Sequence, residues 1–332
     1  MAIADCGFEL MESVDCHNPK SEIRKRGRVN VSMSLEEAIA RVPHWAGALD
    51  LRVERLKGGI TNKNYKISVN GEPFVLRLAG AGTHLLGIDR EHEYAAALSA
   101  AAAGIGPEVL CFIRPEGCLV TRFVEGVPLP SDEMRRAENI PSIAGALHRI
   151  HGMPRIPGAF SPFRTVENYA QTAQKYGVSF PPSFDRLMER MHEIEIAFLT
   201  SPVAPHPCHN DLVNENLLDD GGIRILDWEY AGMGDIFFDL ANFCANQCFH
   251  EDHEELLLRS YFGDVRPYQR ARLKLMKIMS DFREAMWGQV QCGISDLDFD
   301  FRGYADRHFR RLADNLKDSR WERWLREAAG NG

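Results

Sequence analysis

The segment from residue 208 to residue 230, CHNDLVNENLLDDGGIRILDWEY, restricts the possible folds of this chain more strongly than any other stretch. Its apolar runs NLL and IRIL flank residues 219–222, Asp-Asp-Gly-Gly, and this pattern predicts a β-hairpin. With this loop, Asn216 lies opposite Ile225. Asp227 is then the diagonal neighbour of Asn216 on the same face, and a two-residue tip leaves this pairing unchanged.

Two oxygen-bearing side chains in this diagonal relation are suited to sharing a magnesium ion. Their Cβ atoms are expected about 7–8 Å apart, and Mg²⁺ takes oxygen ligands while keeping some waters for a phosphate. Asp211 precedes the first strand on a loop, so its carboxylate can reach the same cleft without binding the metal. A free carboxylate beside a metal-bound triphosphate accepts a hydroxyl proton during phosphoryl transfer. An acidic surface hairpin is the simpler alternative, but it does not account for the joint pattern.

Another hairpin is predicted upstream, where NYKISV and EPFVLRL flank Asn70-Gly71. A two-residue tip gives one largely apolar face, formed by the opposed pairs Val69–Glu72, Ile67–Phe74 and Tyr65–Leu76. The other face presents cations, and its residues are Asn64, Lys66, Val75 and Arg77. Just upstream, KGGITN places Gly58 and Gly59 at a strand end, where a phosphate can approach the backbone closely.

The remaining patterns predict an α+β chain of two lobes. Ser34 and Glu37 form a capping box for a helix that Pro43 stops, and residues 89–103 form an alanine-rich helix closed by Gly104. A Gly/Pro break follows at 126–130. We therefore expect a loosely docked tail at 1–32, a small β-rich lobe at 33–125 and a larger, mainly helical lobe at 126–332.

The composition narrows the classes of function. The 332 residues are 45% hydrophobic and 26% charged with a net charge of −8, which is typical of a globular protein and disfavours a nucleic-acid binder. The longest charge-free run, at 94–107, is too short to span a bilayer, and the acidic N-terminus lacks a signal core. Eight cysteines without a C-x-x-C pair indicate a reducing compartment, so we expect a cytoplasmic protein.

Three segments together resemble a known family. HNDLVNENLL at 209–218 and ILDWEY at 225–230 resemble the catalytic segments of the aminoglycoside phosphotransferase and choline kinase superfamily, whose members are relatives of the protein kinases. FDLANF at 238–243 resembles the choline/ethanolamine kinase signature. Shorter matches that fit the same branch are GGITN at 58–62, VLRL at 75–78 and IGPEVL at 105–110. The resemblance covers about residues 52–310 and implies a protein-kinase-like fold.

The resemblance also implies roles for individual residues, with ATP and Mg²⁺ as cofactors. Asp211 is expected to be the catalytic base, Asn216 and Asp227 to hold Mg²⁺, and Glu229 to touch a second metal or the substrate. The residues expected to bind ATP are Gly58, Gly59, Thr61, Asn62, Arg77, Glu93, Thr121 and Phe123. Within this set, residues 121–126 form the adenine hinge, and Arg77 contacts the phosphates. Glu93 is expected to pair with Arg77, and Glu91 is its competitor because positions i and i+2 point to different faces of a helix.

Several other polar residues are expected to be structural. Asp239 and Asn242 are expected to buttress the catalytic loop, and His209 to orient it by hydrogen bonds. His148 and His151 are three residues apart on a helix, which favours packing over a metal site. Cys244 and Cys248 are four apart and are likewise interpreted as core residues.

The acceptor site is expected along FREAMWGQVQ at 282–291, which resembles the helix that gives choline kinases an aromatic wall. Trp287 matches the first tryptophan of that wall, whereas Val290 stands where many choline kinases have a second one. Tyr230, Tyr304 and Glu229 are the other expected substrate contacts. The acidic run Asp296-x-Asp298-x-Asp300 is either a further contact or a solvated loop.

The sequence therefore predicts an ATP-dependent small-molecule kinase that phosphorylates a primary hydroxyl of a cationic amine, with choline or ethanolamine as the favoured acceptor. Kinases for an aminoglycoside, thiamine or a sugar remain alternatives, as does a non-catalytic nucleotide-binding protein. A protein kinase is disfavoured, because the chain has no G-x-G-x-x-G, D-F-G or A-P-E motif. The oligomeric state stays open.

Overall fold

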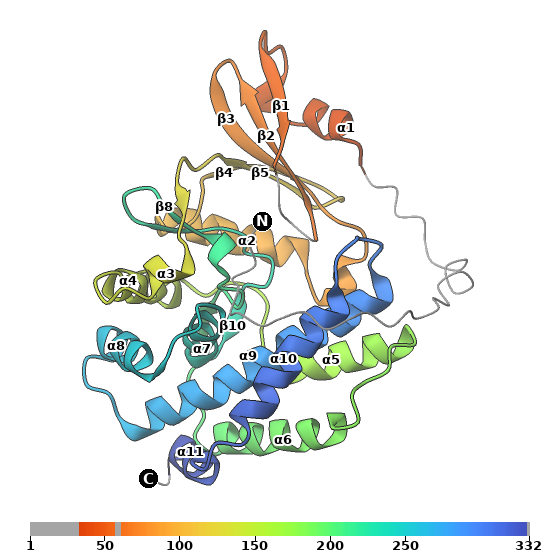
Figure 1. Ribbon diagram of the computed structural model, residues 1–332. Helices are drawn as coiled ribbons and strands as arrows, with labels where there is room; N and C mark the ends of the chain where they lie inside the picture. Colours follow the sequence, from red (N-terminus) through yellow and green to blue (C-terminus); the bar gives the residue numbers. More distant parts are fainter. Residues whose placement is uncertain (1–32, 57–60, 331–332) are drawn as a thin grey trace.

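The computed structural model describes residues 33–56 and 61–330, with a twisted β-sheet at one end and a large group of helices at the other (Figure 1). The sheet has five antiparallel strands in the order β1-β2-β3-β5-β4. The elements of this part are α1 (Leu35–Ala40), η2 (Pro43–Trp45), β1 (Leu51–Arg55), β2 (Lys63–Val69), β3 (Glu72–Leu78), η3 (Thr83–Leu86), α2 (Arg90–Ala102), β4 (Val109–Ile113) and β5 (Cys118–Arg122).

The rest of the chain is mainly helical, as the sequence predicts. Its helices are α3 (Ser131–Met134), α4 (Ile140–His151), α5 (Pro162–Lys175), α6 (Phe184–Thr200), η4 (Asn214–Asn216), α7 (Ile236–Asn246), α8 (Glu251–Phe262), α9 (Pro267–Ile294), α10 (Phe301–Asn315) and α11 (Trp321–Ala328). Its short strands are β6 (Val127–Pro128), β7 (His206–Cys208), β8 (Leu217–Asp219), β9 (Ile223–Ile225) and β10 (Gly232–Gly234).

The hairpin of β2 and β3 has the predicted register. Ile67 lies opposite Phe74, Tyr65 opposite Leu76, and Asn64 opposite Arg77 on the other face. The apolar face packs on α1 and η2 in a small core of its own, which includes Ala38, Val42, Trp45, Ile67, Phe74, Leu76 and Val120. The Ser34–Glu37 capping box that begins α1 is also present. The apolar alternation thus leaves the cationic face of the hairpin free for the cleft.

Helix α2 connects the sheet to the helical part. It starts after Asp89, whose side chain accepts the backbone N–H groups of residues 91 and 92, and Gly104 follows it with a φ of 66°. Its buried alanines, such as Ala96 and Ala100, belong to the large core of the helical part. Helix α2 thus precedes residue 126 in the chain but packs into the core of the helical part. The lobe boundary predicted at residue 126 stays a prediction.

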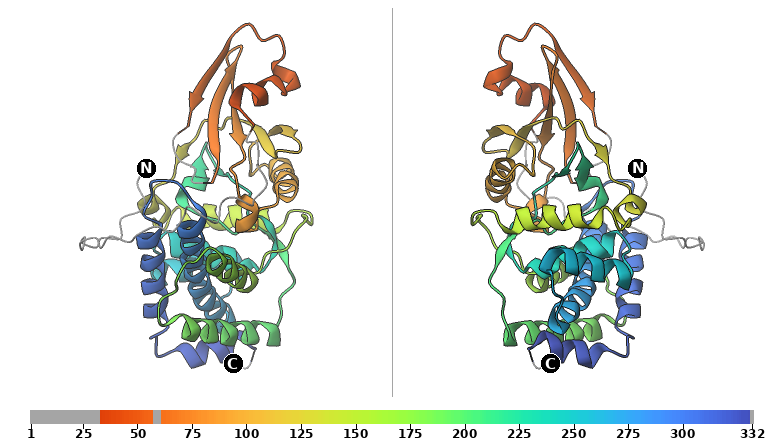
Figure 2. Two further views of the ribbon diagram at one scale, coloured as in Figure 1. Left: turned by 90° about the vertical axis from the view of Figure 1, so that its right-hand side faces the viewer. Right: turned by 90° about the vertical axis from the view of Figure 1, so that its left-hand side faces the viewer.

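Helix α9 is the central element of the helical part (Figure 1). It has 28 residues, most of them buried. The helices packed against it are α5, α7, α10 and α11, and the side views show it running between them beneath the sheet (Figure 2). Side chains of α9 are therefore held rigidly and can serve as the floor of a site.

The hairpin of β8 and β9 differs from its prediction by one residue. Leu217, not Asn216, lies opposite Ile225, and the loop has three residues instead of two or four. Gly221 makes this loop possible, because its φ is +96° and its N–H donates to Asp219 Oδ1 at 2.9 Å. An odd loop length shifts the pairing by one residue. In addition, Asn216 does not lie on a strand, because it is the last residue of η4.

Two predictions fall outside the described residues: the tail at 1–32, and Gly58 and Gly59 of the phosphate-approach loop. Among the residues that the structure does describe, no helix combines the length and the apolar character that crossing a bilayer would need.

Candidate active site

Helix α7 holds the loop that carries Asp211. The two carboxylate oxygens of Asp239 accept the backbone N–H groups of His209 at 2.8 Å and Asn210 at 2.7 Å. Asn242, one turn later, accepts the N–H of Leu212 at 2.7 Å. These contacts fix a loop in which Asn210 has a φ of 66°, and they match the buttressing role expected of Asp239 and Asn242.

His209 lies beneath this loop and bonds to backbone on both sides. Its Nε2 atom is 2.9 Å from the carbonyl oxygen of Leu226, and its Nδ1 atom is 3.3 Å from the backbone N of Asp211. Burial lowers the pKa of His209, so the ring is neutral near pH 7. The contacts agree with an orienting role.

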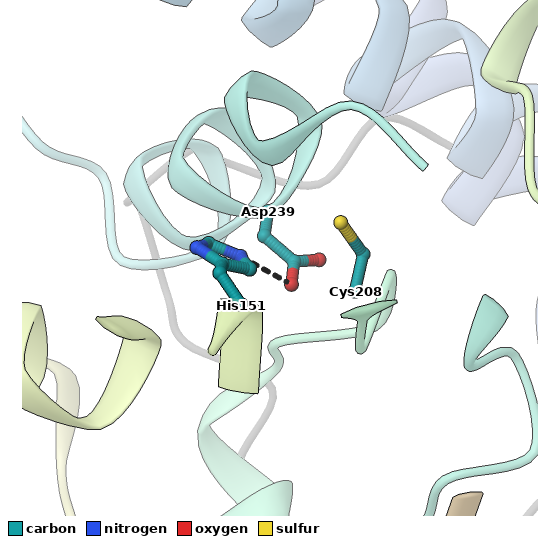
Figure 3. A group of neighbouring side chains, drawn as sticks. All are labelled: His151, Cys208 and Asp239. Carbon is teal, nitrogen blue, oxygen red and sulfur yellow. Dashed lines mark hydrogen bonds and ion pairs between the residues drawn. The ribbon is translucent and has the colours of Figure 1, made fainter. Parts of the chain in front are cut away.

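Behind the loop, His151, Cys208 and Asp239 lie close together (Figure 3). Both oxygens of Asp239 already accept backbone N–H groups, and one of them is also 3.2 Å from His151 Nε2. His151 Nδ1 is 2.7 Å from the hydroxyl of Tyr261. Burial raises the pKa of the Cys208 thiol well above its usual value, whereas a metal ligand must be deprotonated. The group is therefore a packing network, and His148, stacked on Tyr261 with ring centres 3.9 Å apart, extends it.

Asp211 lies at the bottom of the cleft next to an arginine of α9. Arg283 Nη1 is 2.9 Å from Asp211 Oδ1. Burial raises the pKa of Asp211 to about 6, although the charge of Arg283 opposes this rise. The backbone carbonyl of Asp211 accepts the side-chain N–H of Asn216 at 3.0 Å. Asn216 is thus beside the proposed base.

Asp227 follows directly after a backbone contact of Asn216. The N–H of Leu226 donates to the carbonyl of Asn216 at 2.8 Å, which places Asp227 next to it despite the shifted register. Burial and the neighbouring charge of Glu229 raise the pKa of Asp227 well above its usual value. Ligand oxygens of Glu93, Asp227 and Glu229 all lie within 4.8 Å of one another. Carboxylate oxygens of this kind are the ligands that a hard divalent cation takes, and here they also bond to Arg77 and Arg90.

Arg77 reaches the cleft from β3 and pairs with Glu93, not with Glu91. The Arg77–Glu93 ion pair is almost completely buried, and Arg77 Nη1 is also 3.3 Å from Asp227 Oδ1. Glu91 instead binds Arg114 at the surface, at 2.6 Å. Arg77 Nε and Nη2 are buried and have no hydrogen-bond partner among the described residues. These donors are suited to a phosphate.

Arg90, which the sequence analysis missed, joins Glu229 to the N-terminal part. Its Nη1 atom is 2.9 Å from Glu229 and 2.7 Å from Glu93, and its Nη2 atom is 2.7 Å from Asn62 Oδ1. Asn62 also donates to Glu229 at 2.8 Å. Glu229 therefore faces α2 and Asn62, and its expected contact with a second metal or the acceptor stays a prediction. The i, i+3 spacing of Arg90 and Glu93 was the available signal. We call Arg77, Arg90, Glu93, Asp227 and Glu229 the nucleotide-side cluster.

The expected nucleotide-binding backbone lies around this cluster. A Cβ atom on Gly80 would be 1.8 Å from the carbonyl oxygen of Thr61, so only glycine fits there. Thr121 is within β5, and the N–H of Phe123 donates to the carbonyl of Pro73 at 3.1 Å. A hollow of about 550 Å³ adjoins residues 122–125. Since the N–H of Phe123 is already used, adenine recognition by this stretch would fall to later backbone groups.

The predicted acceptor wall comes together on α9 and α10. Trp287 packs edge-to-face on Tyr304 with ring centres 5.4 Å apart, and the hydroxyl of Tyr304 donates to Glu284 at 2.7 Å. Tyr230 lies under the guanidinium of Arg283 at 4.4 Å. Val290 is fully buried, and Asp300 caps α10 by accepting the N–H of Gly303 at 2.8 Å. We call Asp211, Arg283, Glu284 and Tyr304 the acceptor-side cluster.

Comparisons with known proteins point to one family. The family model for choline/ethanolamine kinase matches residues 53–257. Protein LicA of Haemophilus influenzae is 26% identical over 246 residues, which cover 70% of this chain and 72% of that protein. Ethanolamine kinase 2 of Rattus norvegicus is 29% identical over 298 residues, covering 79% and 75%. The crystal structure of a choline/ethanolamine kinase family protein from Mesorhizobium loti has a TM-score of 0.76 at 30% identity, covering 88% and 97%.

Proposed function

Because this chain belongs to the choline/ethanolamine kinase family, we propose that it transfers the γ-phosphoryl group of ATP to the primary hydroxyl of choline or ethanolamine. The observation that carries the proposal is the position of Asp211. Its carboxylate contacts Arg283 of α9, and its charge contributes to the raised pKa of Asp227, which belongs to an oxygen-rich group suited to Mg²⁺. This is the arrangement that phosphoryl transfer to an alcohol requires.

On the nucleotide side, the residues proposed to bind ATP are those that frame the cleft beneath the sheet. Arg77 offers unpaired buried donors to the phosphates, and Glu93 holds its guanidinium in place. Asn216 and Asp227 are proposed to hold Mg²⁺, with Glu229 as a further ligand once Arg90 releases it. Bound Mg²⁺ would neutralise charge that develops on the phosphoryl oxygens. Gly58, Gly59, Thr61, Asn62, Thr121 and Phe123 complete the proposed nucleotide site.

On the acceptor side, Asp211 is proposed to accept the hydroxyl proton as the oxygen attacks the γ-phosphorus. Its raised pKa makes it a stronger base than an ordinary aspartate, while Arg283 keeps it oriented. Tyr230, Trp287 and Tyr304 are proposed to surround the rest of the acceptor. We place this reaction in the cytoplasm, where ATP is available and the cysteine pattern fits a reducing compartment.

The test is Mg²⁺-dependent release of ADP, with choline, ethanolamine, thiamine and kanamycin offered one at a time. We expect turnover with choline or ethanolamine, none in EDTA, and a kcat about 10²–10⁴-fold lower in Asp211→Asn. Asp219→Asn, an exposed acid in the β8–β9 hairpin, is the matched control and should keep its turnover. Near-normal turnover in Asp211→Asn would exclude this mechanism, and turnover only with thiamine or kanamycin would exclude the acceptor.

A further inference from the structure

The acceptor-side cluster contains a buried ion pair of adjacent residues on α9. Arg283 is 1% and Glu284 is 4% exposed. The guanidinium bonds to both Asp211 and Glu284, and the second oxygen of Glu284 accepts the hydroxyl of Tyr304 at 2.7 Å. Although burial acts to raise it, the neighbouring Arg283 keeps the pKa of Glu284 below its usual value, so the pair is charged. A permanent cation is therefore built into the place where a cationic acceptor is expected.

The same arginine covers an aromatic face. Its guanidinium carbon is 4.4 Å from the centre of the Tyr230 ring, and its Nε and Nη2 atoms are buried without a hydrogen-bond partner among the described residues. A quaternary ammonium has no N–H group, so it is bound mainly by the faces of aromatic rings. With Tyr230 covered and Val290 fully buried, Trp287 and Tyr304 remain, and these two pack against each other.

The charged side chains of the acceptor-side cluster favour an acceptor that can donate hydrogen bonds. Two carboxylates and one guanidinium leave one net negative charge among Asp211, Glu284 and Arg283, which matches a single positive charge on the acceptor. A primary ammonium carries three N–H donors for acceptors such as the carboxylate oxygens of Glu284, and each methyl group on the nitrogen removes one donor and adds bulk. A trimethylated nitrogen cannot donate a hydrogen bond to a carboxylate. Of the expected aromatic contacts, only Trp287 and Tyr304 would remain for it.

We propose that Arg283 is a specificity-determining residue, and that it makes the acceptor an amino alcohol with a primary ammonium group in preference to one with a quaternary ammonium. This inference rests on the proposed function, because it concerns the acceptor of that reaction. Arg283 acts by occupying the ring face of Tyr230 and by holding Glu284 as a hydrogen-bond acceptor for the ammonium group.

The test is the series ethanolamine, N-methylethanolamine, N,N-dimethylethanolamine and choline, with kcat/KM measured for each. In the wild type, kcat/KM should fall with each methyl group, and choline should be at least about tenfold poorer than ethanolamine, since one ring of an ammonium cage contributes about that much. Arg283→Met should bring the two ends of the series together, because the Tyr230 face becomes free. The ratio of choline to ethanolamine within one preparation cancels any loss of folded enzyme.

Arg272→Met is the matched control. Arg272 is another almost completely buried arginine on α9, but it bonds to Asp235 and the carbonyl of Ala328, away from the acceptor-side cluster. It should lower stability and leave the ratio unchanged. Choline used as well as ethanolamine by the wild type, or an unchanged ratio in Arg283→Met, would overturn the inference while the proposed function stands. If Arg283→Met does not fold, the kcat/KM values of the wild type for the four acceptors test the inference on their own. Absence of turnover with all four acceptors would overturn the proposed function itself.

Discussion

The two charged clusters of the cleft are built in different ways. The nucleotide-side cluster joins β3 and α2 to residues 227 and 229, so it crosses between the sheet and the helical part. The acceptor-side cluster lies wholly within the helical part, between the catalytic loop and two helices. Both contain a buried arginine with two or more carboxylates. The difference indicates that the first cluster connects two parts of the molecule, whereas the second shapes a pocket inside one of them.

The largest effect should come from breaking the nucleotide-side cluster. Glu93→Gln leaves Arg77 and Arg90 without their shared carboxylate in a buried position, and we expect a loss of about 3–5 kcal/mol in the free energy of unfolding. Urea unfolding followed by circular dichroism measures this loss, and ATP should then raise the melting temperature less than in the wild type. Glu91→Gln, on the same helix but in an exposed pair, is the control and should change little. Equal stability of both variants would mean that this cluster does not hold the two parts together.

Breaking the acceptor-side cluster should cost less stability than breaking the nucleotide-side cluster, and it should also change acceptor binding. Tyr304→Phe removes the hydroxyl that donates to Glu284, and a hydrogen bond to a charged group contributes about 1.5–3 kcal/mol. We expect KM for ethanolamine to rise by about tenfold or more, with KM for ATP unchanged. A rise in KM for ATP instead would show that the two clusters are not separate. Steady-state kinetics with each substrate varied in turn distinguishes the results.

The pH dependence of activity should report the acceptor-side cluster. Burial raises the pKa of Asp211 to about 6, and only the ionised carboxylate can accept a proton. The value of kcat/KM should therefore fall as the pH falls through about 6, well above the range of an unperturbed aspartate at about 3.9. A pH–rate profile from about pH 4.5 to about pH 8.5, in steps of about half a pH unit, measures this fall in kcat/KM. A flat profile down to about pH 4.5 would mean that Asp211 is not the group that limits activity.

The smallest effect should come from the hairpin of β8 and β9, which lies between Asp211 and Asp227 along the chain. Gly221→Ala places a side chain at a φ of +96°, and this should cost about 1 kcal/mol of stability without loss of turnover. Gly222→Ala is the control, because a Cβ atom there meets nothing within 4 Å and its φ is not in the positive range. Thermal melts of both variants measure the difference, and equal melting temperatures would show that the loop relaxes around alanine.

The two hairpins show what local sequence can determine. Asn70-Gly71 permits one tight turn, so the register of β2 and β3 is predicted correctly. Four turn-forming residues at 219–222 permit loops of two, three or four residues. The observed loop has three, and this odd length shifts the register by one residue. The proximity of Asn216 and Asp227 nevertheless holds, because the Leu226–Asn216 backbone bond brings them together.

The same limit applies to the site. Motif residues such as Asp211 and Asp227 could be placed from the sequence, since short-range spacing carries the signal. The partner of Arg77 needed the orientation of α2, which only packing decides. Arg90 and Arg283 were missed because their partners lie 139 and 72 residues away along the chain, and no local pattern announces such contacts. The contact of Glu229 with Arg90 is likewise invisible in the local sequence, and the expected role of Glu229 at a second metal or the acceptor stays a prediction.

Helix α9 has a consequence for how this protein can change over evolutionary time. One part of it supports the loop-holding helix, through the hydrogen bond between Ser280 and Asn242 at 3.0 Å. The following part carries Arg283, Glu284 and Trp287, which belong to the proposed acceptor site. Substitutions in that part are expected to alter which alcohol is accepted, and at Arg283 they also act on Asp211, which its guanidinium contacts.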